Sequence, residues 1–150
     1  IQQRNLRLFG YGAKGMTLSM LEAAVALTGE RISGSDIHRI VQLYFEGMHN
    51  GDAAKLRDAF HPTARIQGVR GDEQRSLACD EFVDYVASVG SRPAAGEAYD
   101  MHIVSIDRVG GAAIAKVAIL WNDRRYTDYL AMIRRADGWS ISEKTFYSPT

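Results

Sequence analysis

Residues 99–148 read YDMHIVSIDRVGGAAIAKVAILWNDRRYTDYLAMIRRADGWSISEKTFYS, four β-rich runs separated by turn signals. The signals are Gly110-Gly111, Asn122-Asp123 and Asp137-Gly138, which favour tight hairpins. The pattern predicts four strands in meander order, at Tyr99–Arg108, Ala112–Asn122, Arg125–Arg135 and Trp139–Ser148. Strands of this length in one sheet must twist and curl.

Helical patterns precede the strands. Apolar residues from Asp36 to His49 recur at helical spacing along one face, with Ser35 as the expected N-cap and Asn50-Gly51 as the expected end. We expect a shorter helix from Asp52 to His61 and a third after Cys79 that closes at Gly90. Helices followed by a meander predict an α+β domain whose helices pack on one face of a curved antiparallel sheet.

Composition narrows the classes of partner. The 150 residues include 18 basic and 18 acidic side chains, and a neutral chain has no broad cationic field for nucleic acid or a membrane surface. The single cysteine, Cys79, indicates a reducing compartment, and we expect the cytoplasm. No histidine shares a metal-ligand spacing with an acidic residue that the fold would aim inward, so we expect no metal. We also expect no cofactor.

Four stretches carry a resemblance to a known family. They are Val41–Asp52, Phe60–Ala64, Tyr126–Leu130 and Gly138–Lys144. Over residues 36–148 the chain resembles the nuclear-transport-factor-2-like superfamily and, within it, the group of putative lumazine-binding proteins. The resemblance implies a cone-shaped domain with a pocket between helices and sheet, and a homodimer. The name of the group establishes no lumazine binding.

Residues 1–33 fall outside this resemblance. A short stretch, Arg7–Met20, is faintly similar to a segment of haloacid-dehalogenase-like hydrolases, but no Asp-x-Asp nucleophile motif is present. We therefore expect an appended helical segment at 1–33 and a nuclear-transport-factor-2-like domain at 34–150.

Counting from the turns predicts which strand residues share a face. Two-residue turns at Gly110-Gly111 and Asp123-Arg124 and a three-residue turn at 136–138 place Asp128 in one row with His102, Ile119 and Phe146. The next row contains Val104, Val117, Leu130 and Lys144. We assign these residues to the helix-covered face, and we assign a second apolar set to the outer face. That outer set is Leu120, Tyr129, Ile133, Trp139 and Ile141.

Three titratable residues on an apolar face need an explanation, because burying an unpaired charge is costly. In the functional interpretation, Asp128 and His102 are an acid–base pair inside a ligand pocket. In the structural interpretation, Asp128 and Lys144 pair as diagonal neighbours and His102 lies near the rim. The residues expected to bind a ligand are Tyr44, Phe60, Trp121, Lys144 and Phe146.

Three functions remain open at this point. The first is a pocket that binds a small apolar or aromatic molecule, the second is a cofactor-independent isomerase, dehydratase or cyclase, and the third is a dimeric interaction module. An inward-facing pair of Asp128 and His102 would favour the enzyme. The outer apolar set predicts a homodimer through that face of the sheet.

Overall fold

The predicted meander is present as the last four strands of a larger sheet. The computed structural model describes residues 29–150, with side chains from residue 36. The elements are α1 (Gly29–Asn50), α2 (Ala53–Ala59), β1 (Phe60–Arg70), β2 (Glu73–Ala78), α3 (Cys79–Val89), β3 (Met101–Val109), β4 (Ala112–Trp121), β5 (Arg124–Arg135) and β6 (Gly138–Ser148). The six strands are ordered β2-β1-β6-β5-β4-β3.

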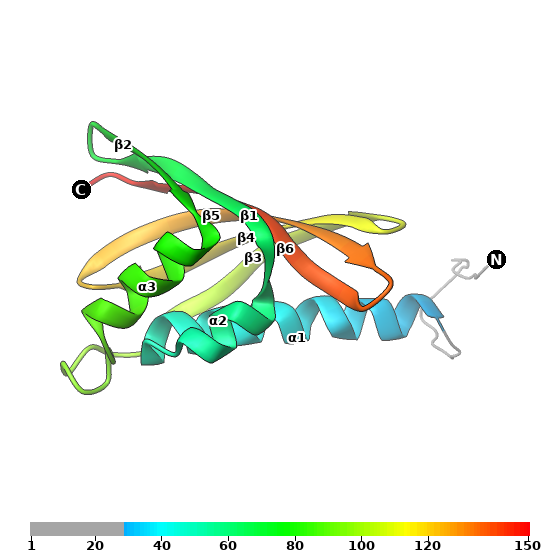
Figure 1. Cartoon of the computed structure of the whole chain (residues 1–150), viewed down its shortest axis with the longest axis horizontal. Helices are drawn as coiled ribbons and strands as arrows, with labels where there is room; N and C mark the ends of the chain where they lie inside the picture. The colour runs from blue at the N-terminus through cyan, green and yellow to red at the C-terminus, as the bar shows by residue number, and fades with distance from the viewer. Residues whose placement is uncertain (1–28) are drawn as a thin grey trace. The chain divides into compact units, whose positions relative to one another are not determined.

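The chain divides into two units, Ile1–Arg39 and Ile40–Thr150, and the sheet belongs to the second. Within that unit, α2, α3 and the second half of α1 cover one face of the curved sheet (Figure 1). The appended segment predicted at 1–33 is described only from Gly29 onward, where it is part of α1. Within residues 29–150, none of the helices has the length and apolar character that crossing a bilayer requires.

The helix ends agree in part with expectation. Gly51 has a φ of 64° and ends α1 as predicted, but α1 begins at Gly29, so Ser35 lies inside the helix and is not its N-cap. The short helix α2 stops at Ala59, two residues earlier than expected. Gly90, with a φ of 94°, closes α3.

Strands β1 and β2 are a hairpin that the sequence reading did not predict. Gly71, with a φ of 62°, opens its two-residue turn. β1 then pairs with β6 in parallel, so the sheet is mixed. A Cβ on Gly68 would lie 2.1 Å from the carbonyl oxygen of Phe146, and this close approach requires glycine.

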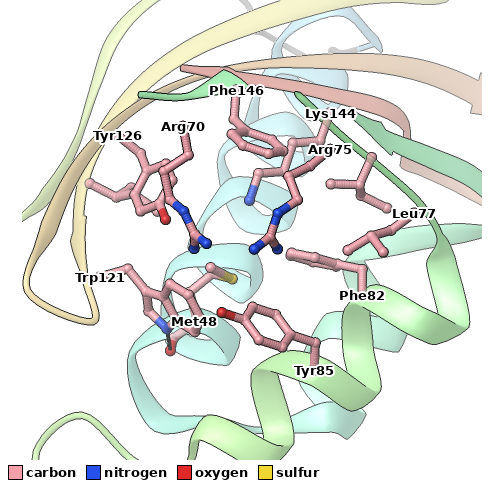
Figure 2. Close-up of a pocket in the computed structure, with 12 residues that line it drawn as sticks. Met48, Arg70, Arg75, Leu77, Phe82, Tyr85, Trp121, Tyr126, Lys144 and Phe146 are labelled. Atoms are coloured by element: carbon pink, nitrogen blue, oxygen red, sulfur yellow. Dashed lines mark hydrogen bonds between the residues drawn. The ribbon is translucent and has the colours of Figure 1, made fainter. Parts of the chain in front are cut away.

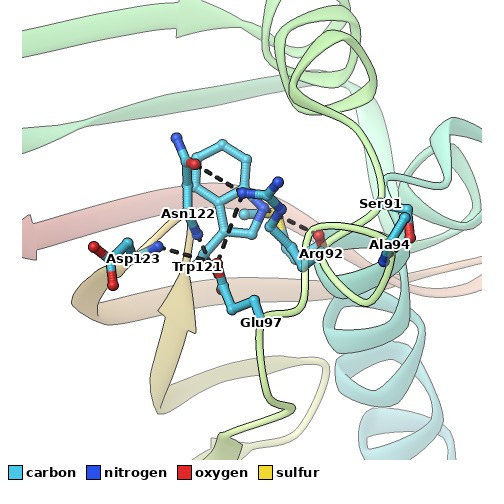
Figure 3. Close-up of polar contacts among 8 residues, drawn as sticks. Ser91, Arg92, Ala94, Glu97, Trp121, Asn122 and Asp123 are labelled. Carbon is cyan, nitrogen blue, oxygen red and sulfur yellow. Dashed lines mark hydrogen bonds and ion pairs between the residues drawn. The ribbon is translucent and has the colours of Figure 1, made fainter.

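The turn between β4 and β5 lies at Asn122-Asp123, one residue earlier than in the predicted register. Both residues have positive φ, 52° and 63°, as a type I′ hairpin requires. Glu97 accepts hydrogen bonds from both backbone N–H groups at 3.1 Å. Arg92 lies 3.7 Å from Glu97 and donates to the side-chain oxygen of Asn122 at 2.7 Å (Figure 3). The loop before β3 therefore holds this turn in place.

Two irregularities change which face some residues occupy. The β3–β4 pairing shifts at Val104, so His102 lies opposite Ala118 and not Ile119. The β5–β6 pairing shifts at Ser142. A residue inserted on one strand of a pair reverses the alternation of side chains beyond it.

These shifts correct the predicted faces. His102 is exposed on the outer face, and Val104 is 51% exposed. Trp139 and Ile141, predicted on the outer face, are buried instead, opposite Arg134 and Met132. The pairs Asp128–Phe146 and Leu130–Lys144 are as predicted, because the turn at 136–137 is one residue shorter than expected and the bulge restores the count.

The contacts of Glu97 predict a measurable loss on its removal. Glu97→Ala should lower the free energy of unfolding by about 2–3 kcal/mol, because a carboxylate that bonds two backbone N–H groups and faces Arg92 is lost. Urea unfolding monitored by circular dichroism measures the change. Asp107→Ala, at an exposed acid on β3, is the control and should change stability by less than about 0.5 kcal/mol. Equal losses in both variants would contradict the role given to Glu97.

Candidate functional site

On the covered face of the sheet, two neighbouring rows of residues run across all six strands. One row follows Arg75, Gly68, Phe146, Asp128, Val117 and Ile103 across all six strands. The neighbouring row follows Leu77, Ile66, Lys144, Leu130, Ala115 and Ile106. Asp128 on β5 and Lys144 on β6 are therefore diagonal neighbours, the spacing that lets long side chains meet.

Asp128, Lys144 and Tyr44 form a buried polar cluster. Asp128 is 0% exposed and Lys144 is 4% exposed. The Lys144 ammonium lies 3.9 Å from Asp128 Oδ2, and the same oxygen accepts a hydrogen bond from the hydroxyl of Tyr44 on α1. The other carboxylate oxygen, Oδ1, is buried without a hydrogen-bond partner among the described residues.

Burial disfavours the charged forms of both Asp128 and Lys144. Desolvation raises the pKa of Asp128, and the charge of Lys144 and the bond from Tyr44 offset part of that rise. Desolvation also lowers the pKa of Lys144, against the charge of Asp128. The pKa of Tyr44 is raised by burial and by the carboxylate beside it. The pair therefore shares one proton in a site where neither charge is well solvated.

Aromatic rings surround the amine. The Nζ atom of Lys144 lies 4.5 Å from the ring centre of Phe82, 5.1 Å from that of Tyr44 and 5.7 Å from that of Phe146. Ring faces attract a cation, which compensates in part for the water that Lys144 has lost.

Lys144 also lies on the wall of a cavity between the helices and the sheet. The cavity has a volume of about 40 Å³, room for a few water molecules or a small planar group. Its lining residues are Met48, Ile66, Arg70, Arg75, Leu77, Phe82, Tyr85, Ile119, Trp121, Tyr126, Lys144 and Phe146. Trp121 is fixed there because its indole N–H donates to the carbonyl of Met48 at 3.0 Å.

Two arginines from the β1–β2 hairpin point into this cavity. Figure 2 shows the guanidinium groups of Arg70 and Arg75 turned toward one another between the aromatic walls, with the Lys144 amine nearby. Hydrogen bonding with the hydroxyls of Tyr126 and Tyr85 raises the pKa of Arg70. Among the residues that the structure describes, none that lines the cavity is acidic. The carboxylate of Glu73 lies 3.6 Å from each guanidinium, but Glu73 is 61% exposed, so its neutralising effect is weak.

The predicted site residues are only partly brought together. Trp121, Lys144 and Phe146 line the cavity. Tyr44 and Phe60 are buried beneath it, with ring centres 5.8 Å apart, and neither lines it.

The predicted acid–base pair does not form. Asp128 lies behind Lys144, while His102 is on the opposite face of the sheet. The bulge at Val104 is the reason, because it reverses the alternation of β3.

Solved structures define the class of fold. A nuclear-transport-factor-2-like protein of unknown function from Silicibacter pomeroyi matches with a TM-score of 0.71 and 22% identity, over 89% of this chain and 99% of its own. Another from Shewanella baltica matches with a TM-score of 0.71 and 24% identity, over 81% and 97% of the two chains. The chain therefore has the nuclear-transport-factor-2-like fold.

Sequence comparison gives the family. Residues 33–147 match the family described as "Putative lumazine-binding", and the chain belongs to that family. It is also 26% identical over 107 residues to the aldolase FrzH of a Cladobotryum species, covering 70% of this chain and 82% of that protein.

Removing either partner of the buried pair should create a pH dependence of stability. In Asp128→Asn, burial lowers the pKa of Lys144 with no carboxylate to offset it, whereas an unfolded lysine has its ordinary pKa of 10.5, so at pH values between the two only the unfolded state keeps this proton. The unfolded state then binds one proton more, so the free energy of unfolding rises by about 1.4 kcal/mol per pH unit toward that value. The wild type binds equal numbers of protons in both states over this range and should show little slope.

Lys144→Met should give the opposite slope. Its buried Asp128 stays protonated, whereas the unfolded carboxyl ionises above its ordinary pKa of 3.8. Stability is therefore lost as the pH rises toward the folded-state pKa. Urea unfolding at several pH values between the two ordinary pKa values measures both slopes. Parallel curves for the wild type and both variants would show that Asp128 and Lys144 do not share a proton.

Proposed function

We propose that the protein binds a small planar molecule with an anionic group in the cavity beneath the β1–β2 hairpin. The observation that carries this proposal is the convergence of Arg70, Arg75 and Lys144 on a cavity to which residues 36–150 contribute no acidic side chain. Paired guanidinium groups match the geometry of a carboxylate and hold it with two parallel hydrogen bonds. An uncharged apolar molecule would desolvate the two arginines further and leave them only the exposed carboxylate of Glu73 as a counter-charge.

The walls of the cavity indicate what kind of body the anionic group of the ligand should be attached to. Trp121, Tyr126, Tyr85, Phe82 and Phe146 present ring surfaces to it, and such surfaces favour flat, apolar partners. The ring pairs Tyr85–Trp121 and Tyr126–Phe146 lie edge to face, at 5.8 and 5.9 Å. A flat body against these rings, with its carboxylate toward the arginines, fits the lining of the cavity.

A cofactor-independent enzyme is the second candidate. The separation of His102 from Asp128 removes the acid–base pair on which an isomerase, dehydratase or cyclase reaction was predicted. Two other findings favour an enzyme: the buried amine of Lys144 on the cavity wall and the similarity to a protein named as an aldolase.

A homodimer through the outer face of the sheet is a separate proposal. The outer patch consists of Ile114, Tyr129, Ile133 and Tyr147, which are between 39% and 52% exposed. It replaces the predicted set that included Trp139 and Ile141. A patch of this kind on a neutral chain favours association of two copies.

Anion binding can be tested with two probes of the same shape. Benzoate should bind at least about tenfold more tightly than benzamide, because only benzoate forms charge-assisted bonds with the arginines. Arg70→Gln and Arg75→Gln should each weaken benzoate binding by about tenfold, a loss of about 1.4 kcal/mol. Isothermal titration calorimetry measures the dissociation constants.

The matched control is Arg65→Gln. Arg65 lies on β1 but is exposed and bonds Ser76 at 2.9 Å, so its replacement should leave benzoate binding unchanged. Equal affinity for benzoate and benzamide would refute the anion site.

The dimer can be tested by light scattering on a size-exclusion column. The wild type should have twice the mass of the 16.6 kDa chain, and Ile133→Glu should be monomeric because it places a charge in the outer patch. Ala87→Glu, at an exposed position on α3, should remain dimeric. A monomeric wild type at micromolar concentration would exclude the proposal.

A further inference from the structure

We propose that Lys144 forms a Schiff base with the carbonyl carbon of a 2-oxo acid whose carboxylate is held by Arg70 and Arg75. This inference rests on the anion-binding cavity proposed above and names the substrate class and the chemistry of that site. It begins from the position of Lys144, whose amine is buried, lies on the cavity wall and shares the cavity with both arginines.

The surroundings of Lys144 suit a nucleophile. An amine attacks a carbonyl only in its neutral form, and most lysines are protonated at neutral pH. Lys144 has lost nearly all of its water, and desolvation lowers its pKa. Its charged neighbours are Asp128 from β5 and the cavity arginines from the β1–β2 hairpin, with the Tyr44 hydroxyl of α1 behind Asp128. The arginines oppose a third positive charge in the same small space.

Asp128 supplies the matching proton acceptor and donor. It lies 3.9 Å from the amine, its Oδ1 has no partner among the described residues, and Tyr44 fixes its other oxygen. Transfer of the shared proton from Lys144 to Asp128 gives a neutral amine beside a neutral carboxylic acid. Neither species then carries an unsolvated charge, so the buried site favours the transfer.

The step balances within these two residues and the substrate. The amine nitrogen bonds to the carbonyl carbon, and one of its protons moves to the former carbonyl oxygen to give a carbinolamine. The carbon–oxygen bond then breaks as the acid proton of Asp128 joins the leaving hydroxyl, and water departs. The products are an iminium on Lys144, a carboxylate on Asp128 and one water molecule. The iminium and the Asp128 carboxylate lie beside one another, so the new charges form an ion pair.

The cavity limits the substrate to a short molecule. Two guanidinium groups and the amine face a volume of about 40 Å³, so the carbonyl must lie within a bond or two of the carboxylate. A 2-oxo acid meets this requirement, because its carbonyl and carboxyl carbons are joined directly. A planar substituent on the far side would lie against Trp121 and Tyr126.

Reductive trapping tests the proposal directly. The protein is incubated with pyruvate and sodium cyanoborohydride, which reduces an iminium but not the free ketone, and peptide mass mapping then locates the added carboxyethyl group. We expect Lys144 to be labelled at least about tenfold faster than the half-buried lysines Lys55 and Lys116, which lie outside the cavity and serve as internal controls. Labelling of Lys144 no faster than of these two would overturn the proposal.

Two further measurements keep the result independent of whether a Lys144 variant folds. Benzoate has no ketone and should slow the labelling of Lys144 in the wild type without affecting Lys55 or Lys116. Arg70→Gln should slow the labelling of Lys144 by pyruvate, whereas Arg65→Gln should not. If benzoate binds in calorimetry but Lys144 is not labelled, the anion site stands and the Schiff base does not. If Lys144 reacts as fast in Arg70→Gln as in the wild type, the role of the arginines is refuted.

Discussion

The buried pair of Asp128 and Lys144 is the constraint on which the covered face of the sheet depends. Each charge alone would be costly in this apolar setting, so the two must meet. They meet only if β5 and β6 pair in the observed register, since a slip of one residue would turn Lys144 to the outer face. Tyr44 extends the same requirement to α1, because its hydroxyl bonds the carboxylate. One polar cluster thus joins the β5–β6 hairpin to α1, which lies far from it in the sequence.

Much of this face could be predicted from alternation, and the exceptions have specific causes. Asp128, Leu130 and Lys144 were placed correctly because side chains alternate along regular strands. His102 was not, because it lies beyond the bulge at Val104. Trp139 was not, because the turn at 136–137 is one residue shorter than predicted and Trp139 lies between that turn and the bulge at Ser142. Neither bulge is marked by a glycine or proline, so the sequence has no local signal for it. The shorter turn at 136–137 shifts the pairing by one residue, and the bulge at Ser142 shifts it back. Only the residues from Glu143 onward therefore have their predicted partners.

The arginines of the cavity could not be predicted because their strands were not recognised. β2 contains Arg75 and other polar residues on an edge strand and has no apolar alternation to mark it. The parallel pairing of β1 with β6 joins residues about eighty positions apart, a kind of contact that local patterns do not report. Gly71-Asp72 was the one available signal, a turn dipeptide followed by a short run. When the hairpin is not recognised, the sequence suggests that Arg70 is an ordinary solvated charge.

The two parts of the site therefore differ in how strongly the fold constrains them. Asp128, Lys144 and the rings around them lie on central strands and helices, where a change of size or charge affects the packing of several elements. Arg70 and Arg75 lie on the edge hairpin, at 18% and 31% side-chain exposure, where substitutions disturb little else. Substitutions on this edge can therefore change the groups that face the cavity while the buried pair stays in place. In the proposed site, the groups that would select the ligand lie on the hairpin, while the proposed nucleophile belongs to the central strands of the same sheet.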